Sequence, residues 1–305
     1  MKKKFLGKLL TMLLVVSMVL TLLPTSALAA WGSWDGWYWS GWSDFLNWGS
    51  GAQDDAQDDA QDNGLAGLTA DGAVQADTVD NSNFLRIFHL DCGRKYFTVK
   101  DVETIIGWLR DNHYTHIELA FGNEGLRFIP DASRMSVGSY TGEQVVAAIK
   151  KGNAAYAKAQ QLSGDDASKA WGESEMQEIL DAAAAAGIQV IPMFDIPGHM
   201  NAVISAMNEL GISASVFSQV GNTYPGNIGQ SFDTTNTEAV AFAKGLVEKY
   251  INYFDSMGCE YFNIAGDECG FSSMSATQYD KYIQLMNDLN TSIEDAGMTT
   301  MMFND

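Results

Sequence analysis

Cysteine is scarce in this sequence. The three that occur, Cys92, Cys259 and Cys269, are too few for a fold held by disulfides, and their spacing matches no zinc motif. The fold must therefore rest on its hydrophobic core. An odd cysteine count in an exported protein leaves at least one thiol free, which indicates either a reducing environment or a cysteine buried in a strand.

Basic residues are also few, and this argues against nucleic acid as a partner. Lys and Arg number 18 against 38 Asp and Glu, so the formal net charge is -20. Such a charge repels phosphate backbones and anionic membranes, whereas a neutral ligand such as a sugar is not repelled. We find no cofactor or metal motif and expect neither. With 46% hydrophobic residues among 305, the chain can bury a sizeable core.

The N-terminal residues 1–29 have the pattern of a signal peptide. Four lysines precede an apolar run over residues 9–23, and Ala27-Leu28-Ala29 offers a small-residue cleavage site. We expect export to the medium or the cell surface of a bacterium. The apolar run is about as long as a short membrane span, so an uncleaved anchor is the alternative. The domain lies outside the cytoplasm in both cases.

Residues 30–80 form a leader and linker of biased composition. Six of the eight tryptophans lie in residues 31–48 among Gly and Ser, and residues 53–63 repeat acidic residues without an apolar face. A segment of this kind cannot offset its ordering entropy. We expect it to be poorly ordered, although aromatic faces that stack on sugar rings could instead serve attachment to glycans or the cell wall.

From residue 83 onward, apolar runs alternate with amphipathic helices, which predicts parallel strands joined by helical crossovers. The strands are expected at residues 84–90, 115–121, 188–194, 260–264 and 299–305. Capping boxes are expected at Thr98 with Asp101, Ser174 with Gln177, and Ser275 with Gln278. Gly187 and Gly297 are placed to end helices, and another helix is expected over residues 237–257. Residues 122–172 form a long excursion, helical over 142–161, of the kind that carries binding surface rather than core.

Polar residues follow the predicted strands at their carboxyl ends, where parallel β/α proteins gather their ligands. In order they are Asp91, Gly122-Asn123-Glu124, Asp195 to His199, Asp267-Glu268 and Asn304-Asp305. A single aspartate after a strand often only caps a helix or makes a turn, and this is the simpler interpretation of Asp91 and Asp305 taken alone. Acid after acid at one edge indicates a polar cleft.

Asp267 and Glu268 form the most informative of these pairs. They follow an apolar strand that should be buried, and two adjacent carboxylates there repel one another, which predicts that one pKa is raised. A carboxylic acid that stays protonated near neutral pH can protonate a glycosidic oxygen. His199 could hydrogen-bond that acid, or it could simply fix its own loop.

Four motifs together resemble the family 20 glycoside hydrolases, the β-N-acetylhexosaminidases and lacto-N-biosidases. The Arg86 to Arg94 segment is similar to the family's first barrel strand, and Ile191 to His199 to its Pro-Gly-His motif. Phe262 to Glu268 is similar to its Gly-x-Asp-Glu motif, and Met302 to Asp305 to its fifth strand. The resemblance covers residues 83–305 and implies an α/β fold, a (β/α)8 TIM-type barrel of which about the first five strands are present.

The resemblance also implies a chemistry, substrate-assisted retaining hydrolysis of β-linked N-acetylhexosaminides, so the expected partner is a glycan containing N-acetylhexosamine. It assigns Asp267 to the substrate's 2-acetamido group, Glu268 to the proton, and His199 to pairing with Glu268. Arg86 would bind hydroxyls of the terminal ring. The remaining residues expected to bind substrate are Asp195, Asn123, Glu124 and Asp305.

The strand-two region departs from many family members, because Glu118 to Gly125 replaces their His-x-Asp-type residues and leaves the histidine's partner unidentified. The Asn123 to Arg127 stretch resembles the lacto-N-biosidase branch, while an exo-acting hexosaminidase shares every residue named. A non-catalytic glycan-binding protein on a degraded barrel is a further alternative. Because five strands leave an open sheet edge, we expect these 305 residues alone to have little or no hydrolase activity.

Overall fold

The computed structural model describes residues 84–160, 169–214, 216–218 and 230–303. The predicted signal peptide (1–29), the leader and linker (30–80) and Asp305 lie outside these ranges, so those expectations stay predictions. Within the described ranges, no helix is both long and apolar enough to cross a membrane.

Five parallel strands in chain order form the sheet, as the sequence predicts. Their order is β1-β2-β4-β7-β8, and every neighbouring pair on this path is parallel. The short β3 (Gly125–Leu126) folds back antiparallel on β2. The five strands span Ile87–Leu90 (β1), His116–Asn123 (β2), Gln189–Phe194 (β4), Tyr261–Asn263 (β7) and Thr299–Met301 (β8).

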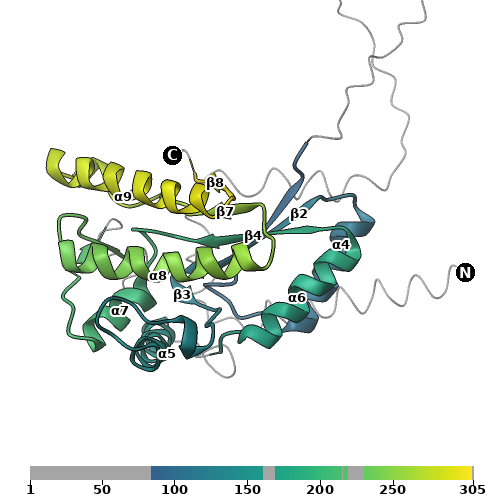
Figure 1. Cartoon of the computed structure of the whole chain (residues 1–305), viewed down its shortest axis with the longest axis horizontal. Helices are drawn as coiled ribbons and strands as arrows, with labels where there is room; N and C mark the ends of the chain where they lie inside the picture. Colours follow the sequence, from purple (N-terminus) through teal and green to yellow (C-terminus); the bar gives the residue numbers. More distant parts are fainter. Residues whose placement is uncertain (1–83, 161–168, 215, 219–229, 304–305) are drawn as a thin grey trace, which may run out of the picture. The chain divides into compact units, whose positions relative to one another are not determined.

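Helices connect the successive parallel strands and cover one face of the sheet. Figure 1 shows α4 beside α6 and α8 beside α9, and both pairs are in contact. The repeated strand, helix, strand order is the unit of a TIM-type barrel, here present in part. The four helices are α4 (Val99–Asp111), α6 (Glu173–Ala186), α8 (Thr237–Ser256) and α9 (Ala276–Asp295).

The predicted helix caps are mostly confirmed. Thr98 and Ser275 each form the expected capping box, and Gly187 ends α6 in the left-handed conformation. The predicted box of Ser174 with Gln177 is wrong. The helix starts earlier, after Gly172, because Glu175 accepts a hydrogen bond from the Gly172 backbone N–H. An acidic side chain in the first turn also suits the positive end of the helix dipole.

The long excursion after β2 contributes core, contrary to expectation. It holds η3 (Ala132–Arg134) and α5 (Gly142–Ala159), but its Phe128 and Trp171 are fully buried against the helices. Elements that the sequence did not predict follow β4, namely α7 (Asn201–Glu209) and the hairpin of β5 (Val216–Ser218) with β6 (Gln230–Phe232).

The other face of the sheet is concave and partly polar. Glu118 on β2 accepts a hydrogen bond from Asn263 on β7, although β4 lies between these two strands. Side chains can meet across an intervening strand only where the sheet curls toward them. A small cluster of Ala120, Met193 and Ala265 lies apart from the main core. The strands are therefore already bent as in a barrel wall.

Candidate active site

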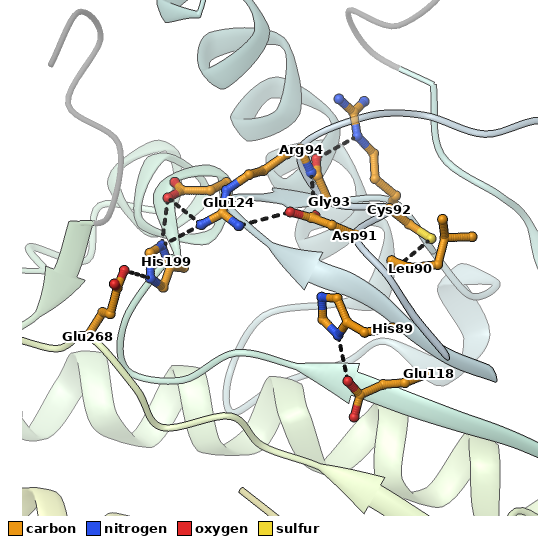
Figure 2. A network of polar contacts seen from close by, with 11 residues as sticks. His89, Leu90, Asp91, Cys92, Gly93, Arg94, Glu118, Glu124, His199 and Glu268 are labelled. Atoms are coloured by element: carbon orange, nitrogen blue, oxygen red, sulfur yellow. Dashed lines mark hydrogen bonds and ion pairs between the residues drawn. The ribbon is translucent and has the colours of Figure 1, made fainter. Parts of the chain in front are cut away.

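Five side chains of alternating charge line up at the carboxyl ends of the strands (Figure 2). Arg94 Nη1 lies 2.8 Å from Asp91 Oδ2 in the loop after β1, and Arg94 Nη2 lies 3.8 Å from Glu124 Oε1 after β2. His199, from the loop after β4, lies 2.8 Å from Glu124 and 3.0 Å from Glu268 after β7. The row therefore joins four strand ends.

His199 is the buried centre of this row, with a side chain 6% exposed. A carboxylate only accepts hydrogen bonds, so Nδ1–H donates to Glu124 and Nε2–H donates to Glu268. Arg94 Nη2, 3.1 Å from Nδ1, is a second donor that lies beside this contact. Burial lowers the pKa of His199, but the hydrogen bonds to Glu124 and Glu268 outweigh it and raise that pKa to about 10. The imidazole is therefore an imidazolium at neutral pH.

Glu268 behaves differently from the sequence prediction. The hydrogen bond from His199 lowers the pKa of Glu268, and burial only partly opposes this. Its side chain is 53% exposed. The expectation that the Asp267-Glu268 pair keeps an acid protonated is therefore wrong for Glu268. The proton between Glu268 and His199 resides on His199. Glu268 contacts His199, whereas Asp267 contacts Asp195, so the two adjacent side chains have different partners.

The raised carboxyl pKa belongs to Asp195, a residue that the sequence analysis assigned to substrate binding. Asp195 is 1% exposed, and burial raises the pKa well above its ordinary value, helped by the charge of Asp267 and a hydrogen bond to it. Two carboxyl groups in contact share one proton. Protonated Asp195 can then donate to Asp267 and hold it ionised and oriented.

Backbone strain gathers at this site. Within the described residues, five non-glycine positions have a positive φ, and four of them are Glu124, His199, Ala265 and Glu268. Such a conformation costs about 1–2 kcal/mol per residue. Backbone hydrogen bonds offset the cost, since Glu124 N–H donates to the His199 carbonyl. Strain of this kind is typical of functional sites that the surrounding fold holds in place.

The loops after β1 and β2 touch backbone to backbone. A Cβ added at Gly93 would lie 1.9 Å from the Asn123 carbonyl oxygen, and one added at Gly125 would lie 2.6 Å from the Gly93 carbonyl oxygen. Only glycine permits this approach. Arg94 and Glu124 therefore stand on two loops that cannot separate without breaking this contact.

The structure brings most of the predicted residues together but reassigns two of them. Glu124, with a fully buried side chain, is the missing partner of His199 rather than a surface for substrate. Arg86 precedes β1 at the opposite end of the strands, and its Nε donates to the His113 carbonyl, so it does not reach the cluster. Arg94 lies there instead. The signal for it was present in the sequence, three residues after Asp91 in the same motif.

Asn123 ends β2 and is 4% exposed, and its Oδ1 has no hydrogen-bond partner within the described residues. A role in substrate binding therefore stays a prediction for Asn123. Asp195, His199 and Asp267 place possible metal-ligand atoms within 4.8 Å of one another. Both ring nitrogens of His199 are already hydrogen-bonded to carboxylates, however, so this group fits a proton network better than a metal ion.

The sequence profile of the glycosyl hydrolase family 20 catalytic domain matches residues 85–298. The chain therefore belongs to this family, whose catalytic domain it carries in part. Its motifs at the strand ends and the partial TIM-type barrel agree with this assignment.

Individual relatives give the same result. A β-N-acetylhexosaminidase of Cellulomonas fimi is 28% identical over 216 residues, which cover 68% of this chain and 36% of that protein. A structure of the pneumococcal exo-β-D-N-acetylglucosaminidase StrH is 29% identical with a TM-score of 0.62, covering 72% of this chain and 53% of that one. The β-N-acetylhexosaminidase of Streptomyces coelicolor A3(2), at 18% identity and a TM-score of 0.52 over 72% of this chain and 39% of its own, shares the fold. The chain thus spans between 36% and 53% of the length of these relatives.

Proposed function

We propose that this protein is a retaining glycosidase that hydrolyses β-linked N-acetylhexosaminides with the help of the substrate's own acetamide. The observation that carries the proposal is the pair of partnerships, Asp195 with Asp267 and His199 with Glu268. Each acid at the centre of the reaction has a buried neighbour that sets its charge. The family and its hexosaminidase relatives support the same substrate class.

In the first step the acetamide oxygen attacks the anomeric carbon, and the bond from that carbon to the leaving oxygen breaks. Asp267, held ionised by Asp195, accepts a hydrogen bond from the acetamide N–H as positive charge develops in the oxazolinium ring. Glu268 protonates the leaving oxygen. A sugar that covers the exposed Glu268 carboxylate raises its proton affinity by desolvation, so the proton moves to it from His199 Nε2 across 3.0 Å.

In the second step Glu268, now a carboxylate, takes a proton from water as the hydroxide attacks the anomeric carbon. The oxazolinium ring opens, and the two inversions retain the configuration. Arg94 replaces Arg86 as the residue proposed to bind ring hydroxyls. Its side chain is 44% exposed, so part of the guanidinium can meet a ligand.

Hydrolysis of 4-nitrophenyl N-acetyl-β-D-glucosaminide by the full-length protein tests this function. Glu268→Gln should lower kcat by roughly 10²–10⁴-fold, the usual contribution of a general acid. In a series of substrates with progressively fluorinated N-acyl groups, kcat should fall as the acyl oxygen becomes less basic. Unchanged turnover in Glu268→Gln would refute the catalytic assignment. If kcat stayed constant across the fluorinated substrates, the acetamide would be excluded as the nucleophile.

Two product patterns fit the site. The similarity to an exo-acting glucosaminidase favours removal of one terminal sugar, whereas Asn123 to Arg127 resembles the lacto-N-biosidase branch, which releases a disaccharide. Lacto-N-tetraose separates the two, because a biosidase frees lacto-N-biose from it. A protein that only binds glycans would instead retain affinity in Glu268→Gln while the unmutated protein shows no turnover.

We also propose that the protein is exported, on the strength of the basic, apolar and small-residue order in residues 1–29. Expression of the full-length protein in a bacterium, followed by fractionation and N-terminal sequencing, tests this. A mature N-terminus just after Ala29 supports export with cleavage. A protein that stays in the cytoplasm with its leader intact would contradict it.

A further inference from the structure

The geometry points to a relay of hydrogen bonds, from the partly exposed His89 through the buried Glu118 to the buried Asn263, as the positioning device for the turn that carries Asp267 and Glu268. The inference rests on the proposed function, because it explains how the two acids are aimed. These three side chains lie on the concave face of the sheet, on three different strands. None of them belongs to the charged row that meets Glu268.

The relay is continuous, and its hydrogen bonds allow only one orientation of the Asn263 amide. His89 Nδ1 lies 2.6 Å from Glu118 Oε2, and Asn263 Nδ2 donates to Glu118 Oε1 at 2.6 Å. The other end of the Asn263 amide, Oδ1, accepts from Ala265 N–H at 2.8 Å. A carboxylate cannot donate and a backbone N–H cannot accept, so the amide can be turned only one way. Figure 2 shows His89 facing Glu118 below the charged row.

Ala265 is the residue that needs such support. It has φ 52°, and Gly266 follows with φ 81°, so the chain turns sharply as it leaves β7. An alanine in this conformation is strained unless its surroundings hold it. The Asn263 amide clamps its N–H, and Tyr282 on α9 donates to the Gly266 carbonyl at 2.9 Å. The clamped turn ends at Asp267 and Glu268.

Glu118 is the residue that links the turn after β7 to β2. Its side chain is 5% exposed, and its two oxygens divide the contacts, Oε2 with His89 and Oε1 with Asn263. The contact with Asn263 crosses over β4, so it ties the β7 turn to β2, the strand that also ends in Glu124. One buried carboxylate thus fixes the acid pair relative to the loop that holds the partner of His199.

A matched control exists on the same face at the amino end of the strands. There His116 Nε2 lies 2.8 Å from Gln189 Oε1, and Gln189 Nε2 donates to Glu260 at 3.0 Å. This second relay joins β2 to β4 and to Glu260, the residue before β7, and it touches no strained turn. Breaking this second relay should lower stability without moving the side chains of Asp267 and Glu268.

The test compares Asn263→Leu with Gln189→Met in the full-length protein. Asn263→Leu should lower kcat by about 10- to 100-fold with KM changed less than threefold, because the acids act in the transition state and a small misplacement is costly there. Gln189→Met, at an exposed position, should lower the Tm less and leave kcat within twofold. An equal loss of kcat in both variants, or no loss in Asn263→Leu, would overturn the proposal.

A compensating pair guards against a variant that does not fold. Asn263→Asp keeps the acceptor for Ala265 N–H but opposes Glu118 with a second carboxylate, and adding Glu118→Gln restores a donor between them. The double variant should recover kcat to within about threefold of Glu118→Gln alone, which double-mutant analysis can detect. Failure of rescue in a folded double variant counts against the relay.

A readout without activity separates this inference from the proposed function. Hydrogen exchange of a peptide spanning residues 264–268 should be faster in Asn263→Leu than in the unmutated protein, while a peptide within α8 exchanges unchanged. If the unmutated protein hydrolyses no N-acetylhexosaminide, the proposed function fails. The exchange result still decides whether Asn263 clamps the turn, and unaltered exchange would refute it.

Discussion

The His199 imidazolium donates from Nε2 to Glu268 across 3.0 Å, and it keeps this proton because Glu124 accepts from its other nitrogen. In the proposed mechanism, the proton needed for the leaving group is thus held on His199, beside the acid that would deliver it. Storage on a buried histidine allows Glu268 to remain exposed and ionised until a ligand covers it. This division is the basis of the first prediction.

Glu124→Gln should shift the alkaline limb of the kcat/KM profile to lower pH. The hydrogen bond to Glu124 raises the pKa of His199, which stands at about 10, so its loss lowers that pKa and His199 deprotonates earlier. A charge-assisted hydrogen bond corresponds to roughly one to two pH units. Steady-state kinetics between pH 6 and 11 measure the limb. Glu178→Gln, an exposed acid on α6, is the control and should leave it in place. A limb that does not move in Glu124→Gln contradicts the stored proton.

Asp195→Asn should stabilise the protein at neutral pH and do so less in acid. Burial raises the pKa of Asp195, so above its ordinary pKa of 3.8 the folded state holds a proton that the unfolded chain has lost. Stability of the unmutated protein therefore falls as the pH rises through this window. Asparagine donates to Asp267 without needing that proton. Urea unfolding at pH 4 and 7.5 measures the difference, with the exposed Asp288→Asn as control. An equal gain at both pH values would argue against a shared proton.

Arg94→Ala and Arg86→Ala should have very different effects on kcat/KM, although both residues lie in one sequence motif. Arg94 belongs to the charged row, so its loss should lower kcat/KM by about 10²-fold, as expected for the proposed charge-assisted contact to substrate. Arg86 lies at the other end of the strands, and its loss should leave kcat/KM within twofold. Initial rates at low substrate concentration measure both. The reverse ranking would restore Arg86 to the pocket.

Gly93→Ala should destabilise the protein by about 1–3 kcal/mol, the usual cost of forcing an atom into a packed space. The added methyl would lie 1.9 Å from the Asn123 carbonyl oxygen, and neither backbone can yield easily. Gly107→Ala is the matched control, because a Cβ there meets nothing within 4 Å, and alanine in a helix should stabilise by roughly 0.5–1 kcal/mol. Equilibrium unfolding of both variants checks the contrast, and equal stability in the two would show that the loops can part.

The strands and helices that carry this site could be predicted because their signals are local. Thr98 and Ser275 cap their helices through residues three positions away, and α8 covers Thr237–Ser256 where its periodicity predicts a helix. The strand-end rule also placed Asp195, His199 and Glu268 at one edge. These inferences need only spacing along the chain.

The partners of these residues could not be predicted, because they depend on how the sheet bends. Nothing in the spacing says that Glu124 faces His199, that Asp195 faces Asp267, or that Glu118 reaches Asn263 across a strand. The sequence analysis consequently expected a raised pKa in the Asp267-Glu268 pair, where that of Glu268 is lowered, and missed the raised pKa of Asp195. Adjacent carboxylates attract attention in a sequence, but the contacts that decide their charge come from other strands.

The glycine contact between the loops after β1 and β2 has a consequence for engineering. Arg94 and Glu124 stand on loops that interlock through Gly93 and Gly125. A loop grafted from a relative to change the sugar preference would therefore have to bring its neighbour with it. The two loops would have to be exchanged together. Substitutions elsewhere around the cleft are therefore the more promising route to a new specificity.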